Sequence, residues 1–420
     1  MSTPDVTLGS GPVGKSRLRA MREGVDWILV GTVIGLVLFG LIMVYSAGPK
    51  FAILQKLTPE YFLERQVLWA ILGLVVMFVG SRIDYHLLRR FTVLMMLITL
   101  GLLVIVAISG VDTLGARRSA IGGSVRPSEL AKLVTIIYVS VWLYSKREVL
   151  NDITLGLLPL MGILGITGGL ILIQPDLSAA ITIILLGGIL YFLAGGEWRQ
   201  IALVMVVSLL VGWVVVNVYP TGIKRIADYM TALRDPELSS QHVLHSLIAV
   251  INGRVFGVGL GLGSTKFTGL PVAPTDSIFA VIAEELGLLG SGVVIVAYLV
   301  ILWRGLMIAG RASDRLGSLL ASGVTIWIVI EAMLNMAVMV GLLPHAGNGL
   351  PFISYGGTSM LVSLAGIGIL LNVARAADVS SEKNRVSGGN AFGAVVDLRW
   401  RDRGRRVSRS GRAASTWQSR

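Results

Sequence analysis

The chain has 420 residues, of which 54% are hydrophobic and 14% are charged, and its mean hydropathy is +0.78. This composition excludes an ordinary soluble domain and predicts an all-α, polytopic integral membrane protein. A β-barrel is excluded because the apolar runs are continuous and do not alternate with polar residues. The absence of cysteine excludes disulfides and thiolate metal sites.

In chain order, the sequence predicts about ten transmembrane helices. A polar, basic leader at residues 1–26 precedes the first apolar run, which is too long for a cleaved signal peptide. The membrane domain is expected at residues 27–375, with a large outer loop at residues 220–276. Its apolar runs, of the length that crosses about 30 Å of hydrocarbon, lie near residues 27–47, 64–80, 91–109, 128–144, 154–173, 178–195, 199–219, 277–303, 317–341 and 358–374.

The basic residues predict the orientation, because Lys and Arg of short loops stay in the cytoplasm. The loops after the second, fourth, sixth and eighth runs carry Arg82, Arg89, Arg90, Lys146, Arg147, Arg199, Arg304, Arg311 and Arg315. Both termini are therefore expected in the cytoplasm. The tail at residues 376–420 is expected to be disordered and attracted to an anionic leaflet. It accounts for much of the net charge of +12, so no nucleic-acid partner is expected.

The outer loops also carry basic residues, on the side where these are normally scarce. They are Arg117, Arg118, Arg126, Lys224, Arg225, Arg234, Arg254 and Lys266. Two interpretations remain open for them. In the first, they are solvated loop charges. In the second, the arginines that bracket a Gly-rich segment at a helix entrance bind an anion such as a phosphate.

Charged and polar residues inside the apolar runs are expected to face the protein interior. Glu129 and Lys132 lie three apart, on one helical face, where they are expected to pair. Glu331 and Asn335 lie four apart in a later run. Whether these residues support the structure or touch a substrate stays open. Asp176 follows a proline at the start of a run, which favours a helix cap over a catalytic role.

The segment LPVAPTDSIFAVIAEELG, residues 270–287, places one acid before an apolar helix and two inside it. Asp276 is either the N-cap of that helix or a general base at the membrane surface. Glu284 lies eight residues further on, about 12 Å deeper along the helix. Glu284 and Glu285 are therefore expected to be supporting groups that face inward and are hydrogen-bonded or protonated.

Four motifs occur in one order: GARRSAIGGSVRPSELAK, IQPDLSAAI, LPVAPTDSIFAVIAEELG and GLLPHAGNGLPFISYGGTSML. From about residue 27 to 375 the chain resembles the SEDS family, the FtsW, RodA and SpoVE proteins, and is slightly more FtsW-like. The resemblance implies a peptidoglycan glycosyltransferase of the bacterial cytoplasmic membrane, which polymerises lipid II in cell division or elongation. It also implies a class B penicillin-binding protein as partner, together with other divisome or elongasome membrane proteins.

The resemblance assigns roles residue by residue. Asp276 matches the aspartate of the family's TDFIFAV motif, held to be catalytic. Glu129 and Lys132 match the PSE..K motif, and Arg118 matches the arginine of GARRW. The chain departs from the family's LPEAHTDFIF at three positions, where it has Val272, Pro274 and Ser277.

The resemblance also implies a mechanism. Asp276 deprotonates the acceptor 4-hydroxyl as it attacks the anomeric carbon of the donor, and a lipid pyrophosphate leaves with inversion. Arg118, Arg126 or Lys266 stabilises that leaving group. Ser354, in the loop at residues 342–357, is a further expected substrate contact, and the apolar surface around residues 277–303 is expected to hold the polyprenyl tail.

No protein metal site is expected, since the four histidines are scattered along the chain. A divalent cation, Mg²⁺ or Mn²⁺, is possible only on the substrate pyrophosphate. Two other functions stay open. A lipid flippase or transporter would use the same charges inside the membrane, and a non-catalytic scaffold of a cell-wall complex would retain Asp276 as a cap.

Overall fold

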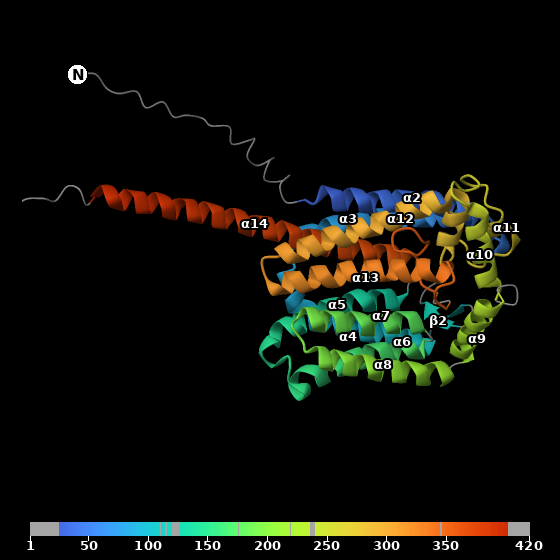
Figure 1. Ribbon diagram of the computed structural model, residues 1–420, viewed down its shortest axis with the longest axis horizontal. Helices are drawn as coiled ribbons and strands as arrows, with labels where there is room; N and C mark the ends of the chain where they lie inside the picture. The colour runs from blue at the N-terminus through green and yellow to red at the C-terminus, as the bar shows by residue number, and fades with distance from the viewer. Residues whose placement is uncertain are drawn as a thin grey trace, which may run out of the picture.

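The computed structural model describes residues 25–109, 111–113, 116–119, 126–174, 176–218, 220–235, 240–344 and 347–401. Long helices lie side by side in a bundle, and each predicted apolar run falls on one of them (Figure 1). The bundle consists of α2 (Trp27–Leu54), α3 (Tyr61–Arg82), α4 (His86–Ser109), α5 (Pro127–Ser145), α6 (Leu158–Ile173), α7 (Leu177–Leu193), α8 (Trp198–Val218), α12 (Ile278–Arg311), α13 (Arg315–Met339) and α14 (Gly357–Arg401). A 3₁₀ turn at Arg147–Val149 and a π-helical turn at Ile153–Leu157 connect α5 to α6.

Within the described residues, seven helices are long and apolar enough to cross a membrane by length and composition. Their burial separates the interior of the bundle from its lipid-facing surface. In α13, 78% of the apolar window is buried, and Trp327 is completely enclosed. On α8, by contrast, Leu210 and Trp213 are 61% and 68% exposed. Apolar side chains at such positions are stable because hydrocarbon, and not water, surrounds them.

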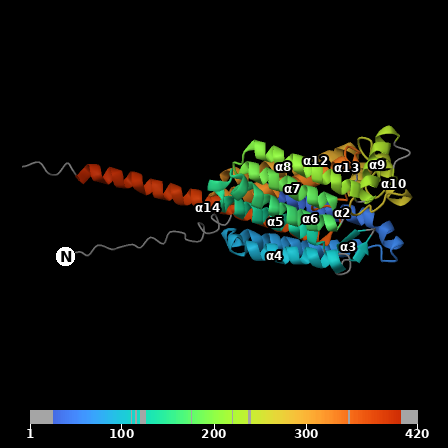
Figure 2. The same ribbon diagram turned by 90° about the horizontal axis from the view of Figure 1, so that it is seen from below.

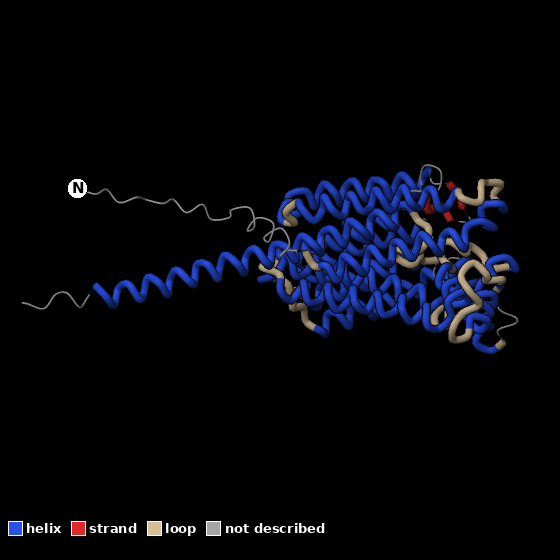
Figure 3. Tube along the Cα trace, turned by 90° about the horizontal axis from the view of Figure 1, so that it is seen from above, coloured by secondary structure: helices blue, strands red, loops and turns tan. Residues whose placement is uncertain are grey.

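One end of the bundle carries three helices that lie outside it and a β-hairpin (Figures 1 and 3). These are α9 (Pro220–Arg234), α10 (Gln241–Gly253), α11 (Thr265–Thr268) and a hairpin of β1 (Val111–Thr113) and β2 (Ala116–Ser119). In Figure 1, α9 lies across the direction of the bundle helices. The strands pair antiparallel, with Asp112 opposite Arg117. This hairpin is the only departure from the all-α prediction among the described residues.

The opposite end joins the start of α2 to the last turns of α12. The Asp26 side chain caps α2 by accepting from the amide of Leu29 at 3.1 Å, and it pairs with the guanidinium of Arg304 at 2.6 Å. The last part of α14 leaves the bundle at this end (Figure 2). Residues 376–401, which belong to the tail predicted to be disordered, continue α14.

Helix α12 is broken at Gly287, whose φ of 65° and ψ of −163° are not helical. The Gly-rich loop that follows α10 supplies the backbone hydrogen bonds lost at the break. The carbonyls of Glu284 and Glu285 accept from the amides of Val258 and Gly259, both at 3.0 Å. The amides of residues 288 and 289 donate to the carbonyls of residues 254 and 255, at 2.9 and 3.1 Å. The bend therefore leaves none of these four backbone groups without a partner.

Candidate functional site

Asp276 lies directly before α12, at the end of the bundle that carries α9 to α11. The cap position of α12 belongs to Ser277, whose side chain makes no capping hydrogen bond. The interpretation of Asp276 as the N-cap is therefore wrong. Its Oδ1 is buried and has no hydrogen-bond partner among the described residues, whereas its backbone carbonyl accepts from Asn335 Nδ2 at 2.8 Å. The backbone of Asp276 is therefore fixed, while one of its carboxylate oxygens has no partner among the described residues.

The loop at residues 350–356 holds the Asp276 segment from the other side. Ser354 Oγ donates to the carbonyl of Thr275 at 2.7 Å and accepts from the amide of Leu350 at 2.6 Å. Gln66 of α3 donates from Nε2 to the carbonyl of Ser354 at 3.1 Å. The Ser354 hydroxyl, predicted to contact substrate, is thus engaged by backbone groups and ties two loops together beside Asp276.

A histidine that the sequence analysis did not identify lies next to Asp276. His242 of α10 has its Nε2 at 3.2 Å from Ser277 Oγ. Burial lowers the pKa of His242; the charge of Asp276 raises it in part, and that of Arg225 on α9 lowers it further. The contact of His242 with Ser277 spans 35 positions of the sequence, so no local pattern indicated it.

Glu284 is 1% exposed and receives a dense set of hydrogen bonds. The amide of Ser264 and the amide and hydroxyl of Thr265 donate to its Oε1, at 3.1, 3.1 and 2.7 Å. The carboxylate therefore fixes the start of α11 against α12. This is the inward-facing, hydrogen-bonded supporting position that was predicted for Glu284.

Glu285 forms a buried ion pair with Lys266, with Nζ and Oε1 2.6 Å apart. Ser46 Oγ of α2 donates to the same carboxylate at 2.6 Å, and Lys266 Nζ also donates to the carbonyl of Gly261 at 2.9 Å. Lys266 is 3% exposed. Its ammonium, expected to bind a leaving pyrophosphate, is directed instead at protein acceptors, because the fully buried Glu285 needs a counter-charge.

The pairing predicted for Glu129 and Lys132 is present, at 2.9 Å. Glu331 of α13 adds a second carboxylate to Lys132. The side chains of Lys132 and Glu331 are 2% and 4% exposed, and that of Glu129 is 15% exposed. The cluster therefore joins α5 to α13 inside the bundle, where an unpaired charge would cost several kcal/mol.

The starts of three helices meet at the same end as Asp276. Asp176 caps α7, as predicted, with Oδ1 accepting from the amide of Ala179, and its Oδ2 accepts from Ser128 of α5 at 3.2 Å. Arg126, just before α5, donates its backbone amide to Thr358 Oγ1 of α14 at 3.1 Å. Arg118 lies in β2, and its side chain is outside the described part of the structure.

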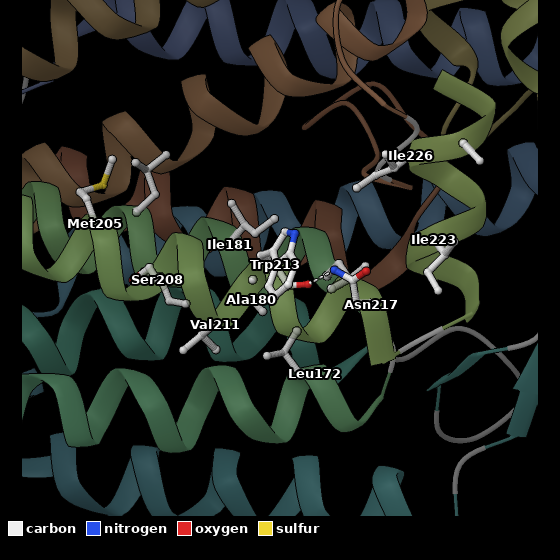
Figure 4. A pocket seen from close by; sticks show the side chains of 15 residues that line it. Leu172, Ala180, Ile181, Met205, Ser208, Val211, Trp213, Asn217, Ile223 and Ile226 are labelled. Carbon is white, nitrogen blue, oxygen red and sulfur yellow. Dashed lines mark hydrogen bonds between the residues drawn. The ribbon is translucent and has the colours of Figure 1, made fainter. Parts of the chain in front are cut away.

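An apolar cavity of about 730 Å³ opens between α7, α8 and α9 (Figure 4). Ile181 of α7, Met205 and Trp213 of α8, and Ile223 and Ile226 of α9 line it. Its composition fits a hydrocarbon chain. The sequence analysis expected a lipid surface around residues 277–303 and did not predict a cavity beside α8, since only the packing of three helices creates it. Among the described residues, no three His, Asp or Glu side chains gather in a way that could hold a metal ion.

Comparison with known proteins gives a consistent result. A family model described as "Cell cycle protein", that of FtsW, RodA and SpoVE, matches residues 26–379. The "Probable peptidoglycan glycosyltransferase FtsW" of Trichlorobacter lovleyi is 39% identical over 358 residues, which cover 83% of this chain and 92% of the relative. "Stage V sporulation protein E" of Bacillus subtilis is 37% identical over 356 residues, covering 83% and 97%.

Solved structures agree with this result. A chain from a structure on the structural coordination of polymerization and crosslinking by a peptidoglycan synthase complex superimposes with a TM-score of 0.68 and 26% identity, covering 84% of this chain and 98% of that one. The rod shape determining protein RodA of Thermus thermophilus superimposes with a TM-score of 0.61 and 25% identity, covering 84% and 97%.

Proposed function

Because the chain belongs to the FtsW/RodA/SpoVE family, we propose that it is a peptidoglycan glycosyltransferase that polymerises lipid II into glycan strands. The observation that carries this proposal is the carboxylate of Asp276. Its backbone is held by Asn335, while its buried Oδ1 has no hydrogen-bond partner among the described residues. A carboxylate in this position is available to accept a proton from a substrate.

In the proposed reaction, the 4-hydroxyl of the acceptor sugar attacks the anomeric carbon of the donor sugar. The hydroxyl proton moves to Asp276, the new bond joins O4 to C1, and the bond from C1 to the lipid pyrophosphate breaks. An α-linked donor gives a β-linked product by this single displacement. No covalent intermediate between sugar and enzyme is needed.

Positive charge is needed where the pyrophosphate leaves. Arg126, at the entrance to α5 and partly exposed, is our candidate among the described side chains. Arg118, in the hairpin of the same end, remains a prediction. Lys266 is less suited, because Glu285 already neutralises it. We assign a divalent cation, if the reaction uses one, to the substrate pyrophosphate and not to a protein site.

The apolar cavity between α7, α8 and α9 is our candidate for a polyprenyl tail. Ile223 and Ile226 of α9 form part of its wall (Figure 4), so the cavity reaches the end of the bundle where Asp276 lies. A tail in this cavity would place a headgroup beside α9. The lining carries Trp213 and Met205 and almost no charge, as a hydrocarbon chain requires.

We further propose that the protein acts in the bacterial cytoplasmic membrane, with Asp276 on the outer side, in cell division or elongation. A class B penicillin-binding protein is the proposed partner. One structural relative comes from a peptidoglycan synthase complex, and this supports such a partnership. Other divisome or elongasome membrane proteins are proposed as further partners.

Replacement of Asp276 by Asn tests the proposal. The amide keeps the size of the side chain but cannot serve as a base, so the polymerisation rate should fall by about 100-fold or more. The measurement is glycan strand formation from labelled lipid II by the purified full chain with its class B penicillin-binding protein. Asp228→Asn on α9 is the matched control, since it removes a carboxylate at the same end and should retain activity.

Equal strand formation by wild type and Asp276→Asn would show that Asp276 is not the general base of the reaction. No strands from a well-folded wild type, together with transfer of lipid II across liposomes, would favour a flippase. The buried cluster of Glu129, Lys132 and Glu331 makes that alternative worth measuring, because paired charges inside a membrane often line transport paths. If the wild type shows neither strand formation nor lipid transfer, the result would favour the scaffold.

A further inference from the structure

We propose that α9 is an interfacial helix, whose exposed apolar face is covered by the hydrocarbon of the membrane leaflet at the Asp276 end of the bundle. The inference concerns how the protein lies in the membrane, and it goes beyond the proposed reaction. The apolar face of α9 consists of Ile223, Ile226, Ala227, Met230 and Leu233.

The spacing of these residues places them on one side of the helix, because positions three, four and seven apart share a helical face. This side is the exposed one. The exposed fractions are 49% for Ile223, 41% for Ile226, 54% for Met230 and 61% for Leu233. A contiguous apolar surface of this kind marks a contact with a membrane or with another molecule.

The opposite side of α9 carries polar residues and faces the protein. Arg225, Asp228 and Tyr229 lie there and are half-buried. The Tyr229 hydroxyl donates to the carbonyl of Leu342, just beyond α13, at 2.9 Å. A surface helix of a water-soluble protein has the reverse arrangement, with its apolar side toward the core. The arrangement in α9 therefore indicates that its exposed side does not face water.

The apolar face of α9 continues the lipid-facing surface of α8. Ile223 and Ile226 line the apolar cavity together with Val211 and Trp213 of α8 (Figure 4). Val211 and Trp213 are themselves 48% and 68% exposed. Because lining residues of both helices are exposed, the cavity is a recess in one continuous apolar surface. Hydrocarbon covers the part of this surface on α8, so the part on α9 lies against the same phase.

Trp213 also indicates the depth of α9, because tryptophans gather at the boundary between hydrocarbon and headgroups. Only seven positions separate Trp213 from Pro220, the first residue of α9, and α9 lies across the direction of the bundle (Figure 1). Interfacial helices lie in this plane, with their apolar face about 5–10 Å into the boundary. Lys224 and Arg234 are exposed on the same helix, and their charges fit the phosphates of the headgroups.

Other occupants fit this face less well. A polyprenyl tail in the cavity would contact Ile223 and Ile226, but Met230 and Leu233 lie beyond the cavity wall. A membrane-spanning helix of a partner would run along the bundle and cross α9 at one place only, since α9 lies across the bundle (Figure 1). Leaflet hydrocarbon covers the whole length of a helix that lies in its plane.

The experiment places a fluorophore on the apolar face. The chain contains no cysteine, so Met230→Cys and Leu233→Cys are each labelled with nitrobenzoxadiazole, whose emission shifts to the blue in hydrocarbon. The labelled full chain is reconstituted alone, at a low protein-to-lipid ratio, in liposomes of phosphatidylcholine and phosphatidylglycerol. A lipid nitroxide near the headgroup end of the acyl chain should quench both labels by about half or more. A nitroxide near the methyl end should quench them less.

Two further cysteine variants are the controls. Lys224→Cys is the matched control, because it is exposed on the same helix but outside the apolar face; iodide in the water should quench its label more than it quenches the two test labels. Leu210→Cys, at a 61% exposed position of α8, should respond most to the nitroxide near the methyl end. Thermal unfolding in detergent shows which variants are folded, and the two test positions are independent of each other.

The outcomes distinguish leaflet hydrocarbon from the other occupants. Quenching of the Met230 and Leu233 labels by iodide and not by lipid nitroxides, while the Leu210 label responds to the nitroxides, would overturn the inference. Labels that leave water only when the class B penicillin-binding protein is added would show a partner surface, and this also overturns it. Shielding that requires a high protein-to-lipid ratio would identify a second copy, and shielding that requires lipid II would identify the tail; each overturns the inference. None of these measurements uses glycan strand formation, so failure of the proposed function would leave the inference standing.

Discussion

Lys132 and Lys266 are both buried, and each lies against a carboxylate of another helix. Glu331 lies 199 positions from Lys132, and Glu285 lies 19 positions from Lys266. In each cluster the lysine cancels a charge that hydrocarbon or packed protein could not solvate. Removing one partner therefore leaves an uncompensated charge, and this matters more than the loss of the pair itself.

For the Lys132 cluster we predict that Lys132→Met destabilises the protein by about 3–5 kcal/mol, since it leaves Glu129 and Glu331 without a counter-charge. Thermal unfolding in detergent measures the loss. Lys146→Met, at an exposed position just after α5, is the control and should be neutral. Adding Glu331→Gln to Lys132→Met should restore part of the stability. No recovery in that double variant would contradict the electrostatic explanation.

At the scale of residues, spacing predicted only contacts within one helix. Glu129 and Lys132 lie three apart, so their pairing followed from helix geometry, and Asp176 was recognised as a cap from the proline and the apolar run beside it. The partners of Lys266 and His242 come from other elements, and composition does not indicate which elements meet. The same reason explains why Lys266 was expected at a substrate and is found at Glu285.

Among the elements, α12 depends on a single glycine at its break. Gly287 has a positive φ of 65°, and a Cβ there would lie 2.4 Å from the amide nitrogen of Gly257 and 2.5 Å from the carbonyl oxygen of Val255. Both neighbours are backbone atoms, so neither can rotate away. The Gly-rich loop and the break in α12 therefore require each other, and together they orient Glu284 and Glu285.

We predict that Gly287→Ala lowers the stability by roughly 1–3 kcal/mol from backbone strain alone, with a further loss from the contact with the loop. Gly292→Ala is the matched control, because it lies on the same helix and a Cβ there would meet nothing within 4 Å. Thermal unfolding of the two variants in one detergent gives the comparison. Equal stability of both would contradict the tight approach at Gly287.

The apolar runs were sufficient to predict the bundle helices, because continuous hydrophobicity of that length has few other structural solutions. The break at Gly287 could not be predicted in the same way. Glycines are frequent in this chain, with 51 in all, and most of those in helices have an ordinary helical backbone. The continuation of α14 to Arg401 was not predicted either, since the polar composition of residues 376–401 was interpreted as disorder.

For the whole molecule, the arrangement of the two ends decides where the chemistry takes place. The start of α2 pairs with the end of α12 through Asp26 and Arg304, and α14 leaves the bundle on that side (Figure 2). Asp276 and α9 to α11 lie at the other end. The positive-inside rule assigns the first end to the cytoplasm, so Asp276 should meet lipid-linked sugars on the outer surface.

Cysteine labelling in intact cells tests this orientation, and the chain is suited to it because it contains no cysteine. Phe256, 80% exposed, lies between α10 and α11 at the Asp276 end, whereas Glu148 lies in the exposed turn after α5 at the opposite end. A maleimide that does not cross membranes should label Phe256→Cys in intact spheroplasts, and Glu148→Cys only after permeabilisation. The reverse pattern would put Asp276 in the cytoplasm, where a polymerase of outward-facing lipid-linked sugars could not use it. Labelling of both sites in intact spheroplasts would instead contradict a bundle that crosses the membrane between them.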